Sequence, residues 1–441
     1  MNNGEKHLTA NKLVMRCSSN ELAILSLVFL TTCSPATHAY LDPGSGSAIL
    51  GVITAALGAL WFTLKNLFYS FTGRKSRGKG LVSQTESLVI FSEGAAYWGT
   101  FRPLIEELIK QQVPFRYRTI DMLDPALAIE SEFMQAKLIS LSASRKHELL
   151  SITAPIMLAT TPNIGCHDSP LEKPKKIDNL IHIFHHVGDV SIYRKHSLDF
   201  YDSVIMVGEF QQKAIRQLES RRGLKAKSLV ALGVPYLDDL VQTRSESRPV
   251  TNSSPSLLIA SSWGEKGCLR SYGTNFINAL VKEGYSLVIR PHPHSANFEP
   301  EFIAQCKQET QSELVSWDET MSPSQAMADA DLLISDTSSI RFDFAFLYEK
   351  PVITLDIPKK ELSGFESEDL DQSWYDDASH EIGPVVAKDK IGELPVIVGR
   401  SLTTPSLSSV KEFRDLTIEN FGTSASHIVS HLKALSQKGS Q

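Results

Sequence analysis

The stretch LLISDTSSIRFDFAFLYEKPVITL, residues 332–355, decides the fold of this chain. An apolar run at 332–334 stops at the four polar residues 335–338. A second apolar stretch then leads through Glu349-Lys350-Pro351 to a third apolar run. The outer runs are typical of buried strands and the middle one of a helix. The stretch therefore predicts a strand–helix–strand unit of a parallel sheet.

The same alternation on either side of this stretch predicts two α/β halves. In the first half we expect strands at 88–91, 155–159, 180–184, 203–207 and 228–232, with helices at 103–110, 129–150 and 210–220. In the second half we expect strands at 257–260, 286–290, 332–335 and 352–355, and a closing helical segment at 410–435. The Ser- and Pro-rich segment 244–256 is typical of a linker. The expected fold class is α/β, with two Rossmann-like domains facing across a cleft.

The first 80 residues differ from the rest and predict a membrane segment. Three basic residues precede a short apolar core at 22–30, so 1–39 is a signal peptide or a first membrane segment. A longer apolar segment, 48–71, is followed by a basic stretch at 73–79, which predicts a transmembrane helix with a basic cytoplasmic flank within 40–80. The alternative is that 48–71 is a buried core helix. The positive-inside rule predicts the inner membrane, with the catalytic domain on its cytoplasmic face.

Bulk composition excludes several classes of protein. Of the 441 residues, 42% are hydrophobic and 21% are charged, which is ordinary for a folded protein. A net charge of −6 argues against a chain that coats nucleic acid. The five cysteines form no CxxC pair, so the sequence predicts neither a disulfide framework nor a metal site.

Polar residues follow two strands of the second half, where parallel α/β sheets bind ligands. Asp336 can cap the helix that follows, and N–H groups near Thr337, Ser338 and Ser339 can bind an anion. Capping alone is the alternative for this stretch. The loop Arg290-Pro291-His292-Pro293 follows the strand before it and by itself is typical of a surface turn. Because both loops lie at the same sheet edge, the combination favours a phosphate site.

Two histidines, His185 and His186, end a strand of the first half. They are interpreted as a general base, as part of a metal site, or as ordinary polar loop residues. The spacing suggests no third metal ligand. A histidine that faces the ligand from the opposite domain suits a base that removes a proton from a hydroxyl group.

In order along the chain, these motifs resemble the CDP-glycerol glycerophosphotransferase family, the teichoic-acid polymerases and primases with a GT-B fold. Phe184-His185-His186 corresponds to the family's Trp-His-Gly motif, and GVPYLDDL at 233–240 is similar to its Gly-x-Pro-x-x-Asp segment. LLIASSWGE at 257–265 and RPHP at 290–293 resemble its strand-and-Trp and His-Pro loops. The block ADADLLISDTSSIRFDFAFLYEKPVI, residues 328–353, is the most specific part of the resemblance. The chain departs from the family pattern at His186, which replaces Gly, and at Thr337, where Tyr is frequent. A family lysine lacks a clear counterpart, although Arg194 and Lys195 are near.

The resemblance implies how the domains are used. Residues 81–243 would form the acceptor domain, 244–256 the linker, 257–400 the nucleotide-donor domain and 401–441 C-terminal helices. The implied protein is a membrane-anchored transferase that moves glycerol phosphate, or a related polyol phosphate, from CDP-glycerol to a hydroxyl acceptor in cell-envelope polymer synthesis and releases CMP. The implied partners are the nucleotide-activated donor, a membrane-bound or envelope polymer acceptor and the lipid bilayer, with no nucleic acid and no cofactor.

The resemblance also implies site residues. The catalytic set is His185, His186 and His292, with either His185 or His186 as the base. The donor-binding set is Arg290, Asp336, Thr337, Ser338, Ser339 and Asp343, where Asp343 either reaches a ribose hydroxyl or is a solvated helix residue. Two other functions stay open, because one fold supports many activities. They are a GT-B glycosyltransferase or epimerase that acts on a nucleotide-sugar, and a non-catalytic nucleotide-binding membrane protein.

Overall fold

The computed structural model describes residues 88–139, 146–167, 169, 171–246, 254–320, 322–357, 364–403 and 407–438. They belong to one compact unit, Gly80–Gln441. The signal peptide or first membrane segment expected at 1–39 and the transmembrane helix expected at 40–80 lie outside the described residues. Within the part that is described, the helices are too short or too polar to cross a membrane.

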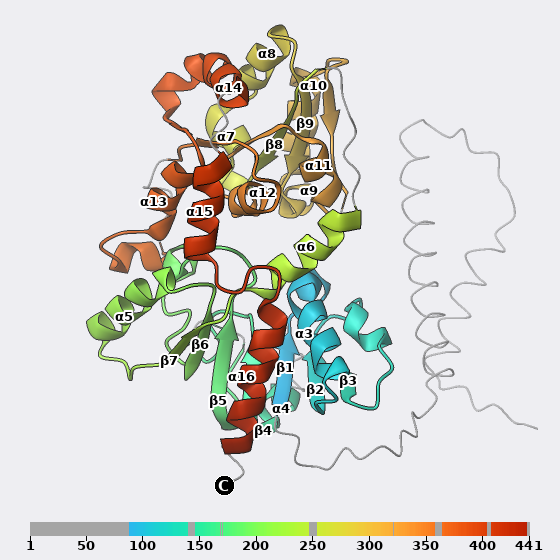
Figure 1. Ribbon diagram of the computed structural model, residues 1–441, viewed down its shortest axis with the longest axis vertical. Coiled ribbons are helices and arrows are strands. Elements are labelled where there is room, and N and C mark those ends of the chain that lie inside the picture. The colour runs from blue at the N-terminus through green and yellow to red at the C-terminus, as the bar shows by residue number, and fades with distance from the viewer. Residues whose placement is uncertain are drawn as a thin grey trace, which may run out of the picture. The chain divides into compact units, whose positions relative to one another are not determined.

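The first sheet is parallel, in the order β3-β2-β1-β4-β5-β6-β7 (Figure 1). Its strands are β1 (Leu88–Ser92), β2 (Phe115–Thr119), β3 (Met134–Leu138), β4 (Thr153–Ala159), β5 (Lys176–Ile183), β6 (Ser203–Met206) and β7 (Ser228–Ala231). The helical segments between and after them are η1 (Ala95–Tyr97), α3 (Trp98–Lys110), η2 (Pro125–Ala128), α4 (Lys146–Leu150), η3 (Val190–Ile192), α5 (Phe210–Arg222) and α6 (Pro235–Glu246).

The second sheet is also parallel, in the order β10-β9-β8-β11-β12-β13. Its strands are β8 (Ser256–Ser261), β9 (Ser286–Pro291), β10 (Val315–Trp317), β11 (Leu332–Ser335), β12 (Val352–Leu355) and β13 (Val385–Val386). The helical segments are η4 (Gly264–Lys266), α7 (Cys268–Tyr272), α8 (Asn275–Lys282), α9 (Pro293–Phe298), α10 (Pro300–Glu309), α11 (Ser324–Asp329), α12 (Ile340–Tyr348), η6 (Glu366–Asp369), α13 (Trp374–Ile382), η7 (Lys388–Glu393), α14 (Leu394–Thr403), α15 (Leu407–Thr417) and α16 (Ser424–Lys438).

Both sheets have the strand order of a Rossmann fold. In each sheet, the first three strands lie side by side in sequence order. The fourth strand pairs with the other edge of the first strand, and the later strands follow it in order. The reversal falls between β1 and β4 in the first sheet and between β8 and β11 in the second. Every residue of β8 and of β11 is buried, as expected for parallel strands covered on both faces. The prediction of α/β architecture with parallel sheets is confirmed, and so is the strand–helix–strand unit at 332–355.

The helix expected at 129–150 is wrong. That region contains the edge strand β3 and the short helix α4, and β2 was not expected at all. In β3 the apolar residues Met134, Ala136 and Leu138 alternate with Gln135 and Lys137, which is the period of a strand. The polar residues of such edge strands obscure the apolar signal that identified the central strands.

The closing segment, expected to be helical, consists of two helices, α15 and α16. Gly422 has φ 75° in the turn that separates α15 from α16. Helix α16 then returns to the first sheet and packs against α3, so Ile428 and Leu432 join its buried core (Figure 1). The carboxylate of Asp238 on α6 accepts hydrogen bonds from the N–H groups of Ser424 and Ala425, at 3.1 and 2.7 Å, and caps this returning helix. The linker expected at 244–256 overlaps the end of α6, which extends to Glu246.

Candidate functional site

The reversal point of the second sheet is organised by Asp336, which follows β11. Its carboxylate accepts from the N–H of Ser262 at 2.8 Å, the hydroxyl of Ser262 at 2.5 Å and the N–H of Cys268 at 2.7 Å. These contacts tie the loop after β11 to the loop after β8. Because Asp336 is fully buried and all its contacts are within the protein, its direct effect is to position the two loops.

The backbone N–H groups of Thr337 to Ile340, which follow Asp336, form an N–H nest. Asp336 accepts from the N–H of Ser338 at 3.1 Å, whereas the N-cap of α12 is Ser339, whose side chain makes no capping bond. The expectation that Asp336 caps α12 is therefore wrong, because its carboxylate is turned toward β8. Within the described part of the chain, no group accepts from the N–H of Thr337, Ser339 or Ile340. These groups, at the positive end of the α12 dipole, can bind an anion.

The buried side chain of Arg341 contacts the loop that carries these N–H groups. Its side chain is only 2% exposed. It donates to the carbonyl of Ser338 at 3.0 Å and to the hydroxyls of Thr354 and Ser379 at 2.9 and 2.8 Å. Burial lowers the pKa of Arg341 to about 10, so the guanidinium stays charged near neutral pH. A buried cation in contact with the loop adds to the attraction of its N–H groups for a phosphate.

Arg290 and His292 were predicted from the Arg-Pro-His-Pro loop, and their side chains have different contacts. Arg290 forms an ion pair with Asp318 at 2.5 Å and donates to the carbonyl of Thr320 at 2.9 Å, so the loop after β10 holds its guanidinium. The Nδ1 of His292 accepts from the N–H of His294 at 3.1 Å. Burial, with the nearby His294 and Arg290, lowers the pKa of His292 to about 4. At neutral pH the His292 proton is therefore on Nε2, which can donate a hydrogen bond but carries no positive charge.

Asp343 lies in the first turn of α12 and is not a solvated helix residue. It is 3% exposed, and its Oδ2 accepts from the hydroxyl of Tyr236 on α6 at 3.3 Å. The Oδ1 atom is buried and has no hydrogen-bond partner. Burial raises the pKa of Asp343 to about 7, while the Tyr236 hydroxyl opposes this shift. A buried oxygen without a partner, next to an anion nest, is suited to a hydroxyl of a phosphate-containing ligand.

The two histidines after β5 have different environments. His185 is half-buried, its Nδ1 lies 2.9 Å from the hydroxyl of Thr160, and its ring packs edge-on against Tyr97. His186 is 7% exposed, and both of its ring nitrogens are buried without a partner. Burial lowers the pKa of His185 to about 4, so the ring is neutral and can accept a proton at pH 7. The geometry favours His185 over His186 as the group that reaches a ligand.

The loop that follows these histidines is held by the second domain. The carboxylate of Asp189 accepts from the N–H of Trp374 at 3.1 Å, and the hydroxyl of Tyr375 donates to the carbonyl of Val187 at 3.1 Å. A side chain at Gly188 would collide with the Tyr375 hydroxyl, at 1.7 Å. The glycine therefore permits the close contact between α13 and the histidine loop.

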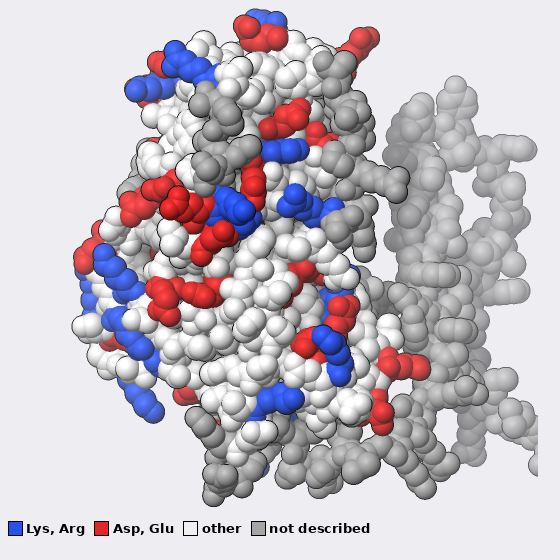
Figure 2. Space-filling view, viewed as in Figure 1, with Lys and Arg blue, Asp and Glu red and all other residues white. Residues whose placement is uncertain are grey.

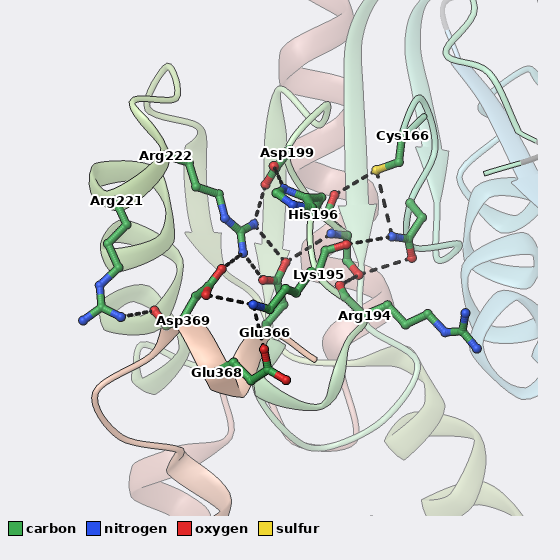
Figure 3. Close-up of polar contacts among 12 residues, drawn as sticks. Cys166, Arg194, Lys195, His196, Asp199, Arg221, Arg222, Glu366, Glu368 and Asp369 are labelled. Carbon is green, nitrogen blue, oxygen red and sulfur yellow. Dashed lines mark hydrogen bonds and ion pairs between the residues drawn. The ribbon is translucent and has the colours of Figure 1, made fainter. Parts of the chain in front are cut away.

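An ion-pair cluster fixes the same loop from its other end (Figure 3). Arg222, at the end of α5, pairs with Glu366 and with Asp369 at 2.8 Å. Lys195 pairs with Glu368 at 2.8 Å and Asp369 at 3.2 Å, whereas the side chain of Arg194 extends away from the cluster. The cluster joins α5 and the loop after β5 to η6 of the second domain.

Figure 2 shows acidic and basic side chains interspersed over the face in view.

Sequence reasoning missed Thr160, Tyr236, Ser262 and Arg341. Their contacts join different elements of the fold, and the separation reaches 107 residues between Tyr236 and Asp343. The one available signal was that Thr160 and Ser262 follow predicted strands. Among the described residues, no three His, Cys, Asp or Glu side chains are grouped to hold a metal ion.

Comparisons with known proteins agree with this arrangement. Residues 193–361 match the family model described as CDP-Glycerol:Poly(glycerophosphate) glycerophosphotransferase. The match includes the anion nest, Arg290, His292 and Asp343, but it begins after His185 and His186. No curated protein matches the chain by sequence.

Solved structures with a similar fold are only distantly related in sequence. The wall teichoic acid polymerase TagF has a TM-score of 0.54 and 12% identity, over 81% of this chain and 90% of that one. A UDP-GlcNAc 2-epimerase from Neisseria meningitidis has a TM-score of 0.50 and 13% identity, over 79% and 99%. A putative UDP-N-acetylglucosamine 2-epimerase from Listeria monocytogenes has a TM-score of 0.50 and 10% identity, over 81% and 98%. At such identities the likeness concerns the fold. The resemblance found in the motifs is confirmed: the chain is a transferase with the two-domain fold of GT-B enzymes, and its residues 193–361 match the CDP-glycerol:poly(glycerophosphate) glycerophosphotransferase family.

Proposed function

We propose that the protein transfers glycerol phosphate, or a related polyol phosphate, from CDP-glycerol to a hydroxyl group of a cell-envelope polymer. The observation that carries the proposal is the pairing of two features on α12. The N–H nest at Thr337–Ile340 suits a diphosphate, and the buried, unpartnered Oδ1 of Asp343 suits a ribose hydroxyl. Together they favour a nucleoside diphosphate donor, and the matched family uses such a donor.

The proposed reaction uses the residues at the two sheet edges. The acceptor hydroxyl attacks the β-phosphorus of CDP-glycerol, a new P–O bond forms, and the bond to the bridging oxygen breaks. The bridging oxygen leaves with CMP, and the hydroxyl proton passes to Nε2 of His185. The N–H nest and the Nε2–H of His292 stabilise the charge on the diphosphate and on CMP. One TagF structure is of a variant soaked with CDPG, which supports the choice of donor.

A nucleotide-sugar glycosyltransferase or epimerase is the second candidate. It rests on the same fold, since two of the similar structures are UDP-N-acetylglucosamine 2-epimerases, one of them only putatively. The family match at 193–361 favours the glycerophosphate donor. A non-catalytic nucleotide-binding protein would use the same nest without turnover.

Calorimetric titration of the full chain with CDP-glycerol, CDP-ribitol and UDP-GlcNAc separates these candidates. We expect CDP-glycerol to bind most tightly and to release CMP when a polyol-phosphate acceptor is added. Ser338→Ala with Ser339→Ala keeps the backbone N–H groups but removes two hydroxyl donors, and should lower donor affinity by roughly 10-fold or more, since a hydrogen bond to a charged group contributes about 1.5–3 kcal/mol. Tighter binding of UDP-GlcNAc, with no binding of CDP-glycerol, would refute the proposed donor.

A matched pair of serines controls for the double substitution. Ser220 and Ser228 are exposed residues of the first domain, far from α12 in the fold. Ser220→Ala with Ser228→Ala should leave donor affinity unchanged. Equal donor affinity in both double variants would mean that Ser338 and Ser339 contribute to the start of α12 but not to donor binding.

We propose that the enzyme is anchored in the inner membrane, with its catalytic domains on the cytoplasmic side. The support is the basic stretch after the second apolar segment. A reporter fused after Gln441 should be active only in the cytoplasm. Reporter activity only outside the cytoplasm would contradict this topology.

A further inference from the structure

We infer that Thr160 is a positioning residue, which orients the His185 ring so that Nε2 faces the acceptor hydroxyl. The inference rests on the proposed function and assigns His185, rather than His186, as the base. Thr160 directly follows β4 and His185 comes two residues after β5. Ala159 pairs with His182 in the ladder, so both residues reach the carboxyl edge of neighbouring strands. The sheet thus places the hydroxyl beside the ring.

The contact is local and enclosed. The Thr160 side chain is fully buried, and its Oγ1 lies 2.9 Å from Nδ1 of His185. The Tyr97 ring, 5.1 Å away between centroids and nearly perpendicular, supports another side of the imidazole. With Nδ1 engaged, Nε2 is the ring nitrogen that is left for a ligand. Rotating the ring would remove the only side-chain hydrogen bond that the structure gives Thr160 within its described part.

A hydroxyl is suited to both protonation states of the base. It can donate to a bare Nδ1, or accept from an Nδ1–H. When Nε2 takes the proton from the acceptor hydroxyl, the imidazolium carries hydrogen on both nitrogens, and Nδ1–H then donates to Thr160 Oγ1. A hydrogen bond that stabilises the imidazolium lowers the barrier for the proton transfer. A methyl group in place of the hydroxyl cannot do this.

His186 has no comparable support. Its nitrogens are buried and unpartnered, its ring lies 4.7 Å from that of His185, and its surroundings include the rings of Phe184 and Tyr193. Burial lowers its pKa well below the usual value for histidine, with smaller contributions from the neighbouring His185 and His182. It fills the space behind the base rather than facing a ligand.

The neighbouring residue offers a matched control. Thr161 is 3% exposed, and its hydroxyl is buried without a partner. Thr160→Val and Thr161→Val are the same chemical change at adjacent buried positions, but only the first removes a hydrogen bond to His185. Thr160→Ser keeps the hydroxyl and tests whether the oxygen, rather than the side-chain shape, is required.

The test measures transfer kinetics of the full chain with CDP-glycerol and a polyol-phosphate acceptor. Thr160→Val should lower kcat on the order of 10²-fold, the effect of a misplaced catalytic group, with donor Kd unchanged. Thr161→Val should keep wild-type kcat, and Thr160→Ser should recover most of it. Equal kcat in Thr160→Val and Thr161→Val, both folded, would overturn the inference while leaving the proposed function intact. Full activity in His185→Ala would overturn the base assignment itself.

A second readout does not depend on activity. With ¹⁵N-labelled histidine, the His185 ring signals are identified by their loss in His185→Ala. Their shifts report which nitrogen carries the proton. Thr160→Val should move the Nδ1 signal of His185, and Thr161→Val should not. An unmoved signal in Thr160→Val would overturn the inference even if kcat had fallen.

Discussion

Replacing His185 with alanine should slow transfer by roughly 10²–10⁴-fold, the usual effect of losing a general base. Donor binding should change little, because the N–H nest proposed to bind the diphosphate belongs to the second domain. The measurement is kcat for CMP release together with the donor Kd from calorimetry. Since burial lowers the pKa of His185 to about 4, the base should stay neutral and active down to about pH 5.

His186→Leu is the comparison for this prediction. An imidazole with two buried, unpartnered nitrogens costs stability, so an apolar side chain of similar size should be tolerated or should stabilise the fold. We expect kcat to remain near that of the wild type. The reverse pattern, with loss of activity in His186→Leu and full activity in His185→Ala, would exchange the two roles.

Replacing Asp343 with asparagine should change how stability depends on pH. Burial raises the pKa of Asp343 to about 7 in the folded chain, from 3.8 for an ordinary aspartate. A carboxyl with a raised folded pKa contributes stability that is complete below its unfolded pKa and is lost as pH rises through the folded value. Between pH 5 and pH 8 the wild type should therefore lose about 2–3 kcal/mol that Asp343→Asn does not lose.

Urea unfolding of the two proteins at pH 5 and pH 8 measures this difference. Other titrating groups are common to both and cancel in the comparison. Asp178→Asn, at an exposed position, should follow the wild type at both pH values. Identical pH dependence in Asp343→Asn and wild type would show that Asp343 ionises normally, in a better-solvated site than the structure describes.

The central strands and the polar loops after them were predictable from sequence, while contacts between distant segments were not. Strands β8, β11 and β12 are continuous apolar runs, so their position and the polar loops at their ends follow from local pattern. Edge strand β3 alternates polar and apolar residues and was taken for a helix. The apolar pattern that predicts a strand is weak where one side of the strand is exposed to solvent.

The direction of each polar side chain also depends on tertiary structure. The sequence places Asp336 before a helix, and capping was the natural expectation. In the fold its carboxylate instead binds Ser262 and Cys268, 74 and 68 residues away in the chain. Arg290 likewise turns to Asp318 on the neighbouring loop. Whether either residue also contacts the donor remains a prediction.

The return of α16 to the first sheet has a consequence for synthesis on the ribosome. The buried core around α3 includes Ile428 and Leu432, which emerge only after the whole second domain has been translated. The first domain therefore cannot complete its core while the nascent chain is being made. Until α16 arrives, the part of this core that α16 covers remains exposed to chaperones. One face of the second sheet has a separate core between β8 and α14, which can form without α16.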